Sequence, residues 1–232
     1  YDTYGFPLDL TQDTLREREL QVDVAGFDQA MESQKARARE SWSGSGDKKL
    51  DLIWFELGNK LEATEFLGYN TLTSQAKILA LVVNGVQKKQ YAKNELVDAV
   101  FNQTTFYAES GGQIADIGKI SNDSMEANVF NVQKIGTLIV HKLKILRGKI
   151  IVGELADLAV DVFVRNAIAS NHSATHIMHQ ALKDVLGAHV NQRGSLNDGE
   201  KFRFDFSHKK PLTANEIILI EEIVNRKIVQ DT

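Results

Sequence analysis

The sequence contains no cysteine, and this absence removes whole classes of chemistry. Zero cysteines among 232 residues exclude disulfides, thiolate nucleophiles and cysteine-ligated metal sites within the chain, and they suit a reducing compartment. No run reaches the roughly 18 apolar residues that a membrane-spanning helix needs. The opening YDTYGFPLDL is not a signal peptide. We therefore expect a cytoplasmic protein with no membrane partner.

Neither sign of charge is in large excess. The chain has 27 lysines and arginines against 31 aspartates and glutamates, a formal net charge of −4, so a nucleic-acid site would have to be a local patch. A Gly-x-Ser-x-Gly nucleophile elbow is also missing. Without that elbow and without cysteine, a covalent acyl intermediate has no evident carrier, and we expect any hydrolysis to use an activated water.

What is present is the composition of a folded protein with more than one unit. Hydrophobic residues make up 43% and charged residues 25%, which is close to the globular average. The length is about one and a half typical domains. There is no initiator methionine and the last helical pattern runs almost to Thr232, so we expect a piece of a longer protein.

Residues 1–46 are predicted to be a helical segment. Four apolar residues recur there at helical spacing, namely Phe27, Met31, Ala38 and Trp42. The stretch SWSGSGD at 41–47 favours flexible backbone that buries little, so a boundary is expected near residue 46. The pattern LDLIWFELGNKL does not distinguish helix from strand, and residues 47–74 are interpreted as a linker of uncertain structure.

Residues 75–160 are predicted to form a small β-barrel. Short apolar and β-branched runs are divided there by glycine and asparagine turns. The runs are KILALVV, LVDAVF, GKIS, EANVFNV, GTLIVHKLKIL and KIIVGEL. Asn84-Gly85 and Arg147-Gly148 are predicted turns. Six or so strands at this spacing fit a closed barrel better than an open sheet with exposed edges.

Residues 161–232 are predicted to form an α+β unit. A helix after Asp161 carries an apolar stripe and stops at Gly187. The stripe consists of Ala174, Ile177, Met178, Ala181, Leu182, Val185 and Leu186. The strand KFRFDF places three phenylalanines on one face, and Thr213 to Glu216 reads as a capping box that opens a last helix through roughly Val229. The predicted fold class of the whole chain is α+β.

The predicted helix carries the histidines with most chemical interest. At 100° per residue, His172, His176 and His179 lie within a narrow arc opposite the stripe and are expected to face a cleft or solvent. Histidines at i and i+4 can supply half of a tetrahedral zinc shell. Ser-Ala-Thr stands between the first two where a zincin protease carries glutamate, which disfavours metalloprotease chemistry. The alternative is a pair of exposed or hydrogen-bonded histidines that bind no ion.

A second candidate is the glycine-containing sequence FYAESGGQ. Gly111 and Gly112 followed by Gln113 let backbone N–H groups approach a ribose, a phosphate or an ester carbonyl. The same residues can form only a turn or a bulge. Gly-Gly-Gln also occurs in class I peptide release factors, so ester hydrolysis on tRNA by another route stays open.

A third candidate is the basic stretch from Arg193 to Lys210. It holds five basic and three acidic residues, and its net charge of +2 suits a phosphate track that gives affinity without reading a sequence. A solvated strand edge explains the same pattern.

Several long motifs resemble those of the alanyl-tRNA synthetase family, in that family's order. YDTYGFPLDLT resembles the end of the tRNA-recognition region, and TTFYAESGGQIADIG resembles the glycine-rich barrel motif. NHSATHIMHQALKDVLGAHVNQRGSL with FRFDFSH resembles the editing domain. The likeness covers essentially the whole chain.

The resemblance implies that the parent enzyme joins alanine to tRNA(Ala) with ATP. Its class II catalytic domain would lie upstream, and only that domain would hold ATP and magnesium. This chain would be the proofreading part, which hydrolyses Ser-tRNA(Ala) and Gly-tRNA(Ala) because serine and glycine differ too little in size from alanine to be excluded at synthesis. DNA is not an expected partner.

The resemblance also assigns site residues. It implies zinc held by His172 and His176, with a cysteine and a histidine from a later segment. Thr175 and Gln192 would line the catalytic pocket, and substrate binding would fall to Gly111, Gly112, Gln113 and Arg193. Since the chain has no cysteine, we expect its two-histidine remnant to bind zinc weakly and deacylate slowly or not at all.

Three other functions stay open at this point. The first is a freestanding trans-editing deacylase, against which the opening YDTYGFPLDLT argues. The second is a non-catalytic tRNA-binding or interdomain module whose histidines are incidental. The third is a release-factor-like esterase that depends on Gln113.

Overall fold

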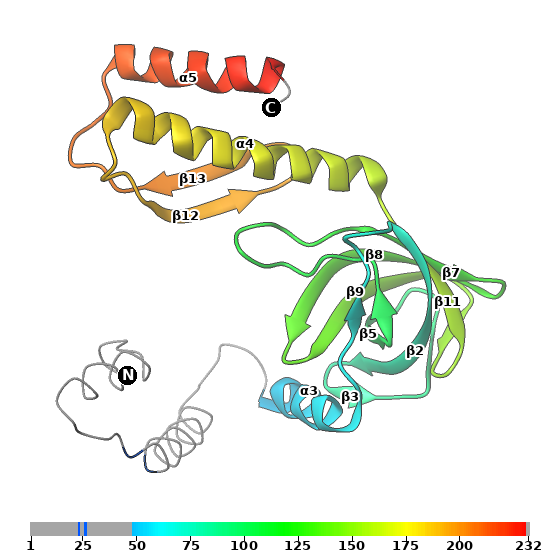
Figure 1. Cartoon of the computed structure of the whole chain (residues 1–232). Helices are drawn as coiled ribbons and strands as arrows, with labels where there is room; N and C mark the ends of the chain where they lie inside the picture. Colours follow the sequence, from blue (N-terminus) through cyan, green and yellow to red (C-terminus); the bar gives the residue numbers. More distant parts are fainter. Residues whose placement is uncertain (1–22, 24–25, 27–47, 231–232) are drawn as a thin grey trace. The chain divides into compact units, whose positions relative to one another are not determined.

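A computed structural model of the chain describes residues 23, 26 and 48–230 (Figure 1). The predicted helix over 1–46 and the boundary near residue 46 lie outside these residues, apart from the two single positions. The chain divides into two units between Lys48 and Lys49, and the elements below belong to the second, apart from Lys48 at the start of the first helix. Among the described residues, no helix is both long and apolar enough to span a membrane.

A closed barrel of six strands forms the first part of this unit, as predicted. Every neighbouring pair is antiparallel, in the order β11-β7-β8-β9-β5-β2, and β2 closes the ring on β11. The strands are β2 (Thr73–Val83), β5 (Leu96–Phe101), β7 (Gly118–Asn122), β8 (Met125–Ile135), β9 (Leu138–Arg147) and β11 (Leu155–Val160). Closure leaves no long free edge, which explains why these short β-branched runs are stable together.

Short strands complete the barrel part. Asn84 and Gly85, at φ 49° and 73°, turn β2 into β3 (Val86–Gln87), which confirms a predicted turn. Gly148 at φ 71° turns β9 into β10, and a Cβ there would lie 1.8 Å from the Ser124 carbonyl oxygen. The remaining pairs are β4 (Gln90–Ala92) with β10 (Lys149–Ile151), and β1 (Glu65–Phe66) with β6 (Gln103–Thr104).

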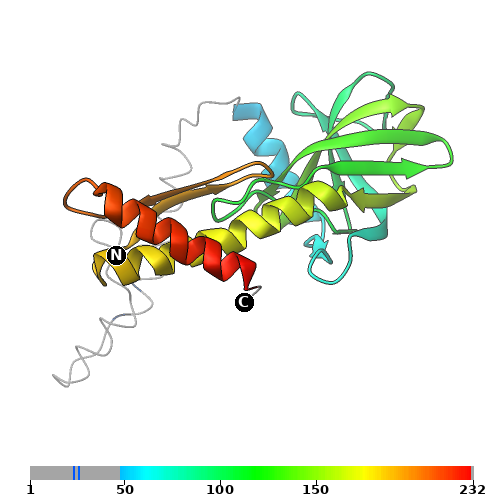
Figure 2. The same cartoon turned by 90° about the horizontal axis from the view of Figure 1, so that it is seen from above.

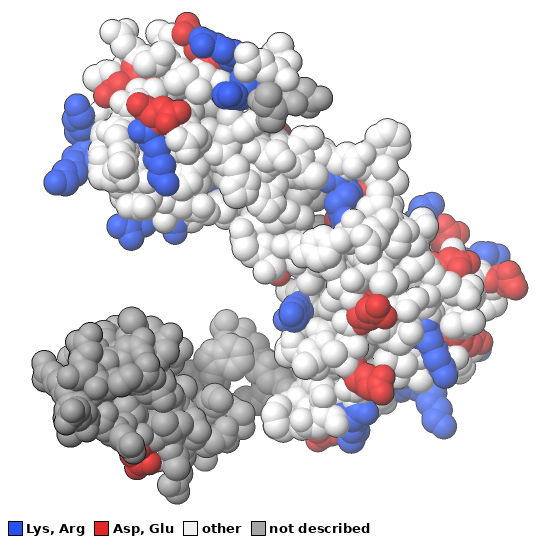
Figure 3. Space-filling view, viewed as in Figure 1, with Lys and Arg blue, Asp and Glu red and all other residues white. Residues whose placement is uncertain are grey.

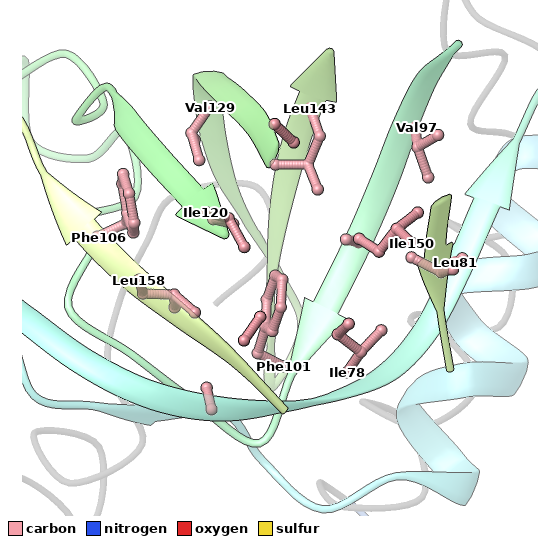
Figure 4. Close-up of a cluster of buried hydrophobic side chains, with 14 of the residues drawn as sticks. Ile78, Leu81, Val97, Phe101, Phe106, Ile120, Val129, Leu143, Ile150 and Leu158 are labelled. Atoms are coloured by element: carbon pink, nitrogen blue, oxygen red, sulfur yellow. The ribbon is translucent and has the colours of Figure 1, made fainter. Parts of the chain in front are cut away.

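Alternation along the strands fills the barrel interior with apolar side chains (Figure 4). In β11, for example, Ala156, Leu158 and Val160 are buried while their neighbours are exposed. Phe101 and Phe106 have no exposed surface, and full burial of such a side chain contributes about 1.5–3 kcal/mol.

The sequence between the predicted boundary and the barrel contains a helix, α3 (Lys48–Lys60). Trp54 and Leu57 lie one turn apart and pack against a second apolar cluster that includes Val100 and Leu138. The pattern that was ambiguous in the sequence is therefore helical. Residues 48–74 contain α3, β1 and the first two residues of β2.

The second part consists of two helices and a hairpin (Figures 1 and 2). The elements are α4 (Val162–Leu186), β12 (Gln192–Asn197), β13 (Phe202–Phe206) and α5 (Ala214–Val229). Their shared core includes Leu182, Val190, Ile220 and Phe204. These elements confirm the predicted α+β class. The division into two domains at residue 160 stays a prediction.

Local capping signals explain where these helices begin and end. Asp161 Oδ1 accepts the N–H groups of Phe163 and Val164 at the start of α4, and Gly187 caps its end. Thr213 and Glu216 form the predicted capping box of α5. The N–H and hydroxyl of Thr213 donate to the Glu216 carboxylate and hold its pKa below the usual value.

One histidine is buried in the barrel. His141 in β9 has no exposed surface, its Nε2 lies 2.8 Å from Thr104 Oγ1, and its Nδ1 lies 3.3 Å from the Ala99 carbonyl oxygen. Because a carbonyl oxygen only accepts, Nδ1 carries the proton and Nε2 accepts from the Thr104 hydroxyl. Burial lowers the pKa of His141 from 6.5 to about 4, so the folded protein holds it neutral at pH 7.

Acid is therefore expected to destabilise the barrel through His141. The folded pKa lies below the unfolded one, so this contribution is complete above pH 6.5 and is lost as the pH falls to about 4. The loss corresponds to about 3 kcal/mol in the free energy of unfolding. Urea unfolding across this pH window measures it. A His141→Gln variant should lose most of this pH dependence, and an exposed control, His189→Gln, should keep it. If the free energy of unfolding changed equally with pH in both variants, the assignment to His141 would be contradicted.

Candidate active site at the junction of barrel and helix

Helix α4 is anchored to the barrel by an arginine near its start. Arg165 Nε donates to Asp116 Oδ1 at 2.8 Å, and Nη2 forms an ion pair with Asp116 Oδ2. The guanidinium also donates to the carbonyl oxygens of Gly68 and Thr105, each at 3.0 Å. The Asp116 side chain has no exposed surface, so loss of either partner would leave an unpaired buried charge, which typically costs about 3–5 kcal/mol.

The glycine-containing segment forms a tight turn that packs on the hairpin. Gly111 and Gly112, at φ 60° and 83°, link Ser110 to Gln113, which pair with each other. A Cβ on Gly112 would lie 2.4 Å from the Ser195 carbonyl oxygen. Main-chain bonds complete this contact, since Asn197 N donates to Gly112 O at 2.7 Å. The segment is therefore a turn that also joins the barrel to β12, and the assignment of Gly111, Gly112 and Gln113 to substrate binding stays a prediction.

Gln113 connects this turn to the histidine helix. Its Oε1 lies 2.7 Å from His172 Nδ1, across 59 residues of sequence. The His172 ring stacks on the His176 ring with centroids 5.2 Å apart and planes 17° apart. His172 is partly buried and His176 is exposed. The structure thus brings together three of the residues that the sequence singled out.

The third histidine of the predicted arc lies elsewhere. His179 packs on Phe204 of β13 with ring centroids 5.1 Å apart, and its Nε2 is buried without a hydrogen-bond partner. The expectation that all three histidines face a cleft or solvent is therefore wrong for His179. The reason is the hairpin, whose strand β13 packs on this side of the helix. The angular positions of residues around a helix do not show which other elements pack on it.

Thr175 is buried in the structure, and its assignment to catalysis stays a prediction. It is 4% exposed, and its hydroxyl lies 2.9 Å from Asn171 O and 2.7 Å from Asn197 Oδ1. Asn197 is 1% exposed and makes the main-chain bond to the glycine turn. Thr175 therefore links α4, through Asn197, to the turn that carries Gln113.

Gln192 and Arg193 lie at the exposed start of β12. Gln192 Nε2 donates to Ser195 Oγ at 3.0 Å, and Arg193 falls at a register shift between Gln192 and Gly194. Among the described residues, no hydrogen bond joins either side chain to His172 or His176. Their assignment to catalysis and substrate binding stays a prediction.

A cleft lies on the barrel side of the turn. It has a volume of about 470 Å³ and is lined by Glu109, Ser110, Gly111, Gly112, Gln133, Lys134 and Ile135. Gly111 and Gly112 therefore border open space, while Gln113 turns toward α4. His172 and His176 do not line this cleft.

His172 and His176 fit zinc in ligand type and spacing but provide only two ligands. Within residues 48–230, no group of three or more histidine, cysteine, aspartate or glutamate side chains could hold a metal ion. A tetrahedral shell would need ligands from outside the described residues. The 2.7 Å contact between His172 Nδ1 and Gln113 Oε1 is nevertheless the kind of outer contact that metal-ligating histidines make.

The basic stretch after α4 is exposed. Its five basic residues, Arg193, Lys201, Arg203, Lys209 and Lys210, all lie at the surface, and Figure 3 shows lysine and arginine side chains over this part of the molecule. Arg203 pairs with Asp205 at 3.1 Å. The Lys201 and Glu200 N–H groups that donate to Asp198 lower the pKa of that carboxyl.

Sequence reasoning missed the residues that hold the junction together. Arg165 offered one signal, because a cation in the first turn of a helix opposes the helix dipole and needs a partner elsewhere. Asp116 and Asn197 offered none, since each is a single polar residue in a loop or at a strand end.

Comparison with known proteins places the chain in a family. The family model described as "tRNA synthetases class II (A)" matches residues 1–163. Because that is more than half of the chain, the protein belongs to this family of class II tRNA synthetases. The match ends at the start of α4, before His172.

Curated relatives extend over the whole chain and are alanine–tRNA ligases. The identity is 51% over 228 residues with the enzyme of Cereibacter sphaeroides, covering 98% of this chain. It is 49% and 50% over 233 residues with those of Sinorhizobium medicae and Rhizobium meliloti, covering 100%. The chain spans 26% of the length of each relative. These matches confirm the resemblance seen in the motifs.

Replacing Gly112 by alanine should destabilise the junction more than replacing Gly111. Both residues have positive φ, so each substitution should cost about 1–2 kcal/mol in backbone strain. Only Gly112 also meets Ser195, whereas Gly111 has open space, so Gly112→Ala should lose about 1–3 kcal/mol more. Urea unfolding of the two variants measures this difference, and equal losses would show that the turn does not pack on β12.

Zinc should bind the purified chain weakly because His172 and His176 are the two ligands that the described residues provide. Equilibrium dialysis measures the uptake, with a His172→Ala, His176→Ala double variant as the control. Stoichiometric submicromolar binding by the chain would contradict a two-ligand site.

Proposed function

We propose that this chain is the editing part of an alanine–tRNA ligase, and that the full-length enzyme uses it to hydrolyse the ester bond of Ser-tRNA(Ala) and Gly-tRNA(Ala). Support comes from about 50% identity to enzymes named alanine–tRNA ligase and from the motifs that resemble an editing domain. Such a reaction is needed because glycine and serine differ from alanine by only one methylene or one hydroxyl group. A difference of that size gives the site that charges the tRNA too little discrimination between these amino acids.

The observation that carries the proposal is the 2.7 Å contact between Gln113 and His172. It joins a barrel turn and a helix that are far apart in sequence, and it occurs at the residues that the family resemblance selects. The ion pair of Arg165 with Asp116 and the contact of Thr175 with Asn197 support the same junction from two sides.

Ester hydrolysis at this site would need an activated water, and His172 is placed to hold one. Its Nδ1 bonds to Gln113, so its Nε2 remains for a metal ion or for the proton of a water. Zinc, when bound there, would polarise the water or the ester carbonyl. The missing ligands would be the cysteine and the histidine that the family resemblance implies from a later segment.

The other site residues take distinct parts in this proposal. Exposed Gln192 is available to contact the aminoacyl group. Thr175 is buried, so its part is to hold Asn197 and the glycine turn in place. Exposed basic residues around β12 and β13, including Arg193, provide electrostatic attraction for the phosphates of tRNA(Ala).

The parent protein would attach alanine to tRNA(Ala) with ATP and magnesium in a part of the enzyme outside this chain. That activity, and the cytoplasmic location expected from the sequence, stay predictions.

A release-factor-like esterase is disfavoured by the position of Gln113. The residue is 9% exposed and bonded to His172, so it is not free to enter another active site. A non-catalytic tRNA-binding module remains the second candidate, because the described residues supply only two metal ligands.

Replacing His172 by alanine in the full-length enzyme should abolish proofreading and spare synthesis. We expect hydrolysis of Ser-tRNA(Ala) to fall by about a hundredfold or more, as is typical for loss of a group that activates water, while alanylation of tRNA(Ala) is unchanged. Deacylation of labelled Ser-tRNA(Ala) measures the first and aminoacylation the second.

His189→Ala is the matched control for this experiment. His189 is an exposed histidine whose Nε2 lies 2.9 Å from His208 Nδ1. No hydrogen bond joins it to Gln113 in the part of the chain that the structure describes, so the variant should proofread normally. Normal proofreading by His172→Ala would contradict a role of His172 in proofreading.

A further inference from the structure

We infer that Gln113 is a positioning residue that holds His172 in the Nδ1–H tautomer and so directs its Nε2 lone pair into the site. The inference deepens the proposed function. It rests on that function only in what the Nε2 lone pair is used for. The tautomer itself is a property of the folded chain and can be measured without tRNA or metal.

The backbone of Gln113 is fixed before its side chain is considered. Gln113 N donates to Ser110 O at 3.0 Å and Ser110 N donates to Gln113 O at 3.2 Å. On the next residue, Ile114 N donates to Asn197 O at 3.1 Å. Because the residue is only 9% exposed, its amide has little freedom to turn away from His172.

The contact between the two side chains then determines where the imidazole proton lies. A carbonyl oxygen can only accept, so a bond between Gln113 Oε1 and His172 Nδ1 requires a proton on Nδ1. A neutral imidazole carries one proton, so Nε2 keeps its lone pair. If the amide were turned so that its NH₂ group met Nδ1, the proton would lie on Nε2 and His172 would have no lone pair left for a metal ion or a water.

His176 restrains the same ring from another direction. The two rings are nearly parallel, at 17°, with centroids 5.2 Å apart. Gln113 thus holds one edge of the His172 ring and His176 covers one face, while Nε2 points away from Gln113. Fixing tautomer and orientation through the other ring nitrogen is how outer contacts prepare histidine ligands for a metal.

Nitrogen-15 NMR of the metal-free chain in mildly alkaline buffer is the direct test. Two-bond correlations to the ring protons distinguish Nδ1–H from Nε2–H for each histidine. We expect His172 to be predominantly Nδ1–H. A predominantly Nε2–H ring would overturn the inference, whatever the chain's activity on tRNA.

Variants separate the role of Gln113 from mere packing. Gln113→Leu keeps most of the side-chain volume but removes the acceptor, so His172 should shift toward Nε2–H. Gln113→Glu keeps an acceptor and should preserve Nδ1–H. Gln180→Leu is the matched control, because Gln180 is an exposed residue of α4 that bonds to Asp184; it should leave His172 unchanged.

Zinc affinity provides a second measurement. Calorimetric titration with Zn²⁺ should show binding that is about ten- to a hundredfold weaker in Gln113→Leu and retained in Gln113→Glu. An unchanged tautomer and unchanged affinity in a folded Gln113→Leu chain, or loss of Nδ1–H in Gln113→Glu, would overturn the inference. If Gln113→Leu fails to fold, the wild-type spectrum and Gln113→Glu decide.

The two hypotheses can fail separately. Absence of deacylation in the full-length enzyme, with Nδ1–H present, would remove the proposed function and keep the tautomer. The opposite tautomer, with proofreading that depends on His172, would keep the function and remove the role of Gln113.

Discussion

The ion pair between Arg165 and Asp116 is the contact on which the candidate site depends. Asp116 lies three residues after Gln113 on the barrel loop, and Arg165 lies seven residues before His172 on α4. One buried pair therefore fixes both segments whose side chains must meet. Seven residues of helix rise about 10 Å, so a small tilt at Arg165 would separate His172 from Gln113. The extra bonds to Gly68 and Thr105 limit such a tilt.

Much of the fold was predictable because its determinants are local. Short β-branched and apolar runs divided by turns predicted the barrel, and turn chemistry predicted the hairpin at Asn84-Gly85. Capping chemistry predicted the end of α4 at Gly187 and the start of α5 at Thr213. Each of these signals lies within a few residues of the feature it specifies, so a single sequence contains it.

The site was predictable only in part, because its contacts are not local. Helical spacing placed His172 and His176 on one face, but no pattern relates His172 to Gln113 or Thr175 to Asn197. The same limit explains the error at His179, whose surroundings are decided by β13. Family resemblance selected residues near the junction, whereas their hydrogen bonds and burial required the structure.

The connection between the barrel and α4 constrains the number of residues that separate the barrel from His172. β11 ends at Val160 and α4 begins at Val162, so Asp161 alone joins them. Each helical residue turns the chain by about 100°. An insertion or deletion of a single residue between Asp161 and His172 would therefore rotate the His172 side chain about the helix axis by more than a quarter turn. Related sequences that keep this junction should vary freely in the solvent-facing side chains of α4. The number of residues between Arg165 and His172 should stay constant among them.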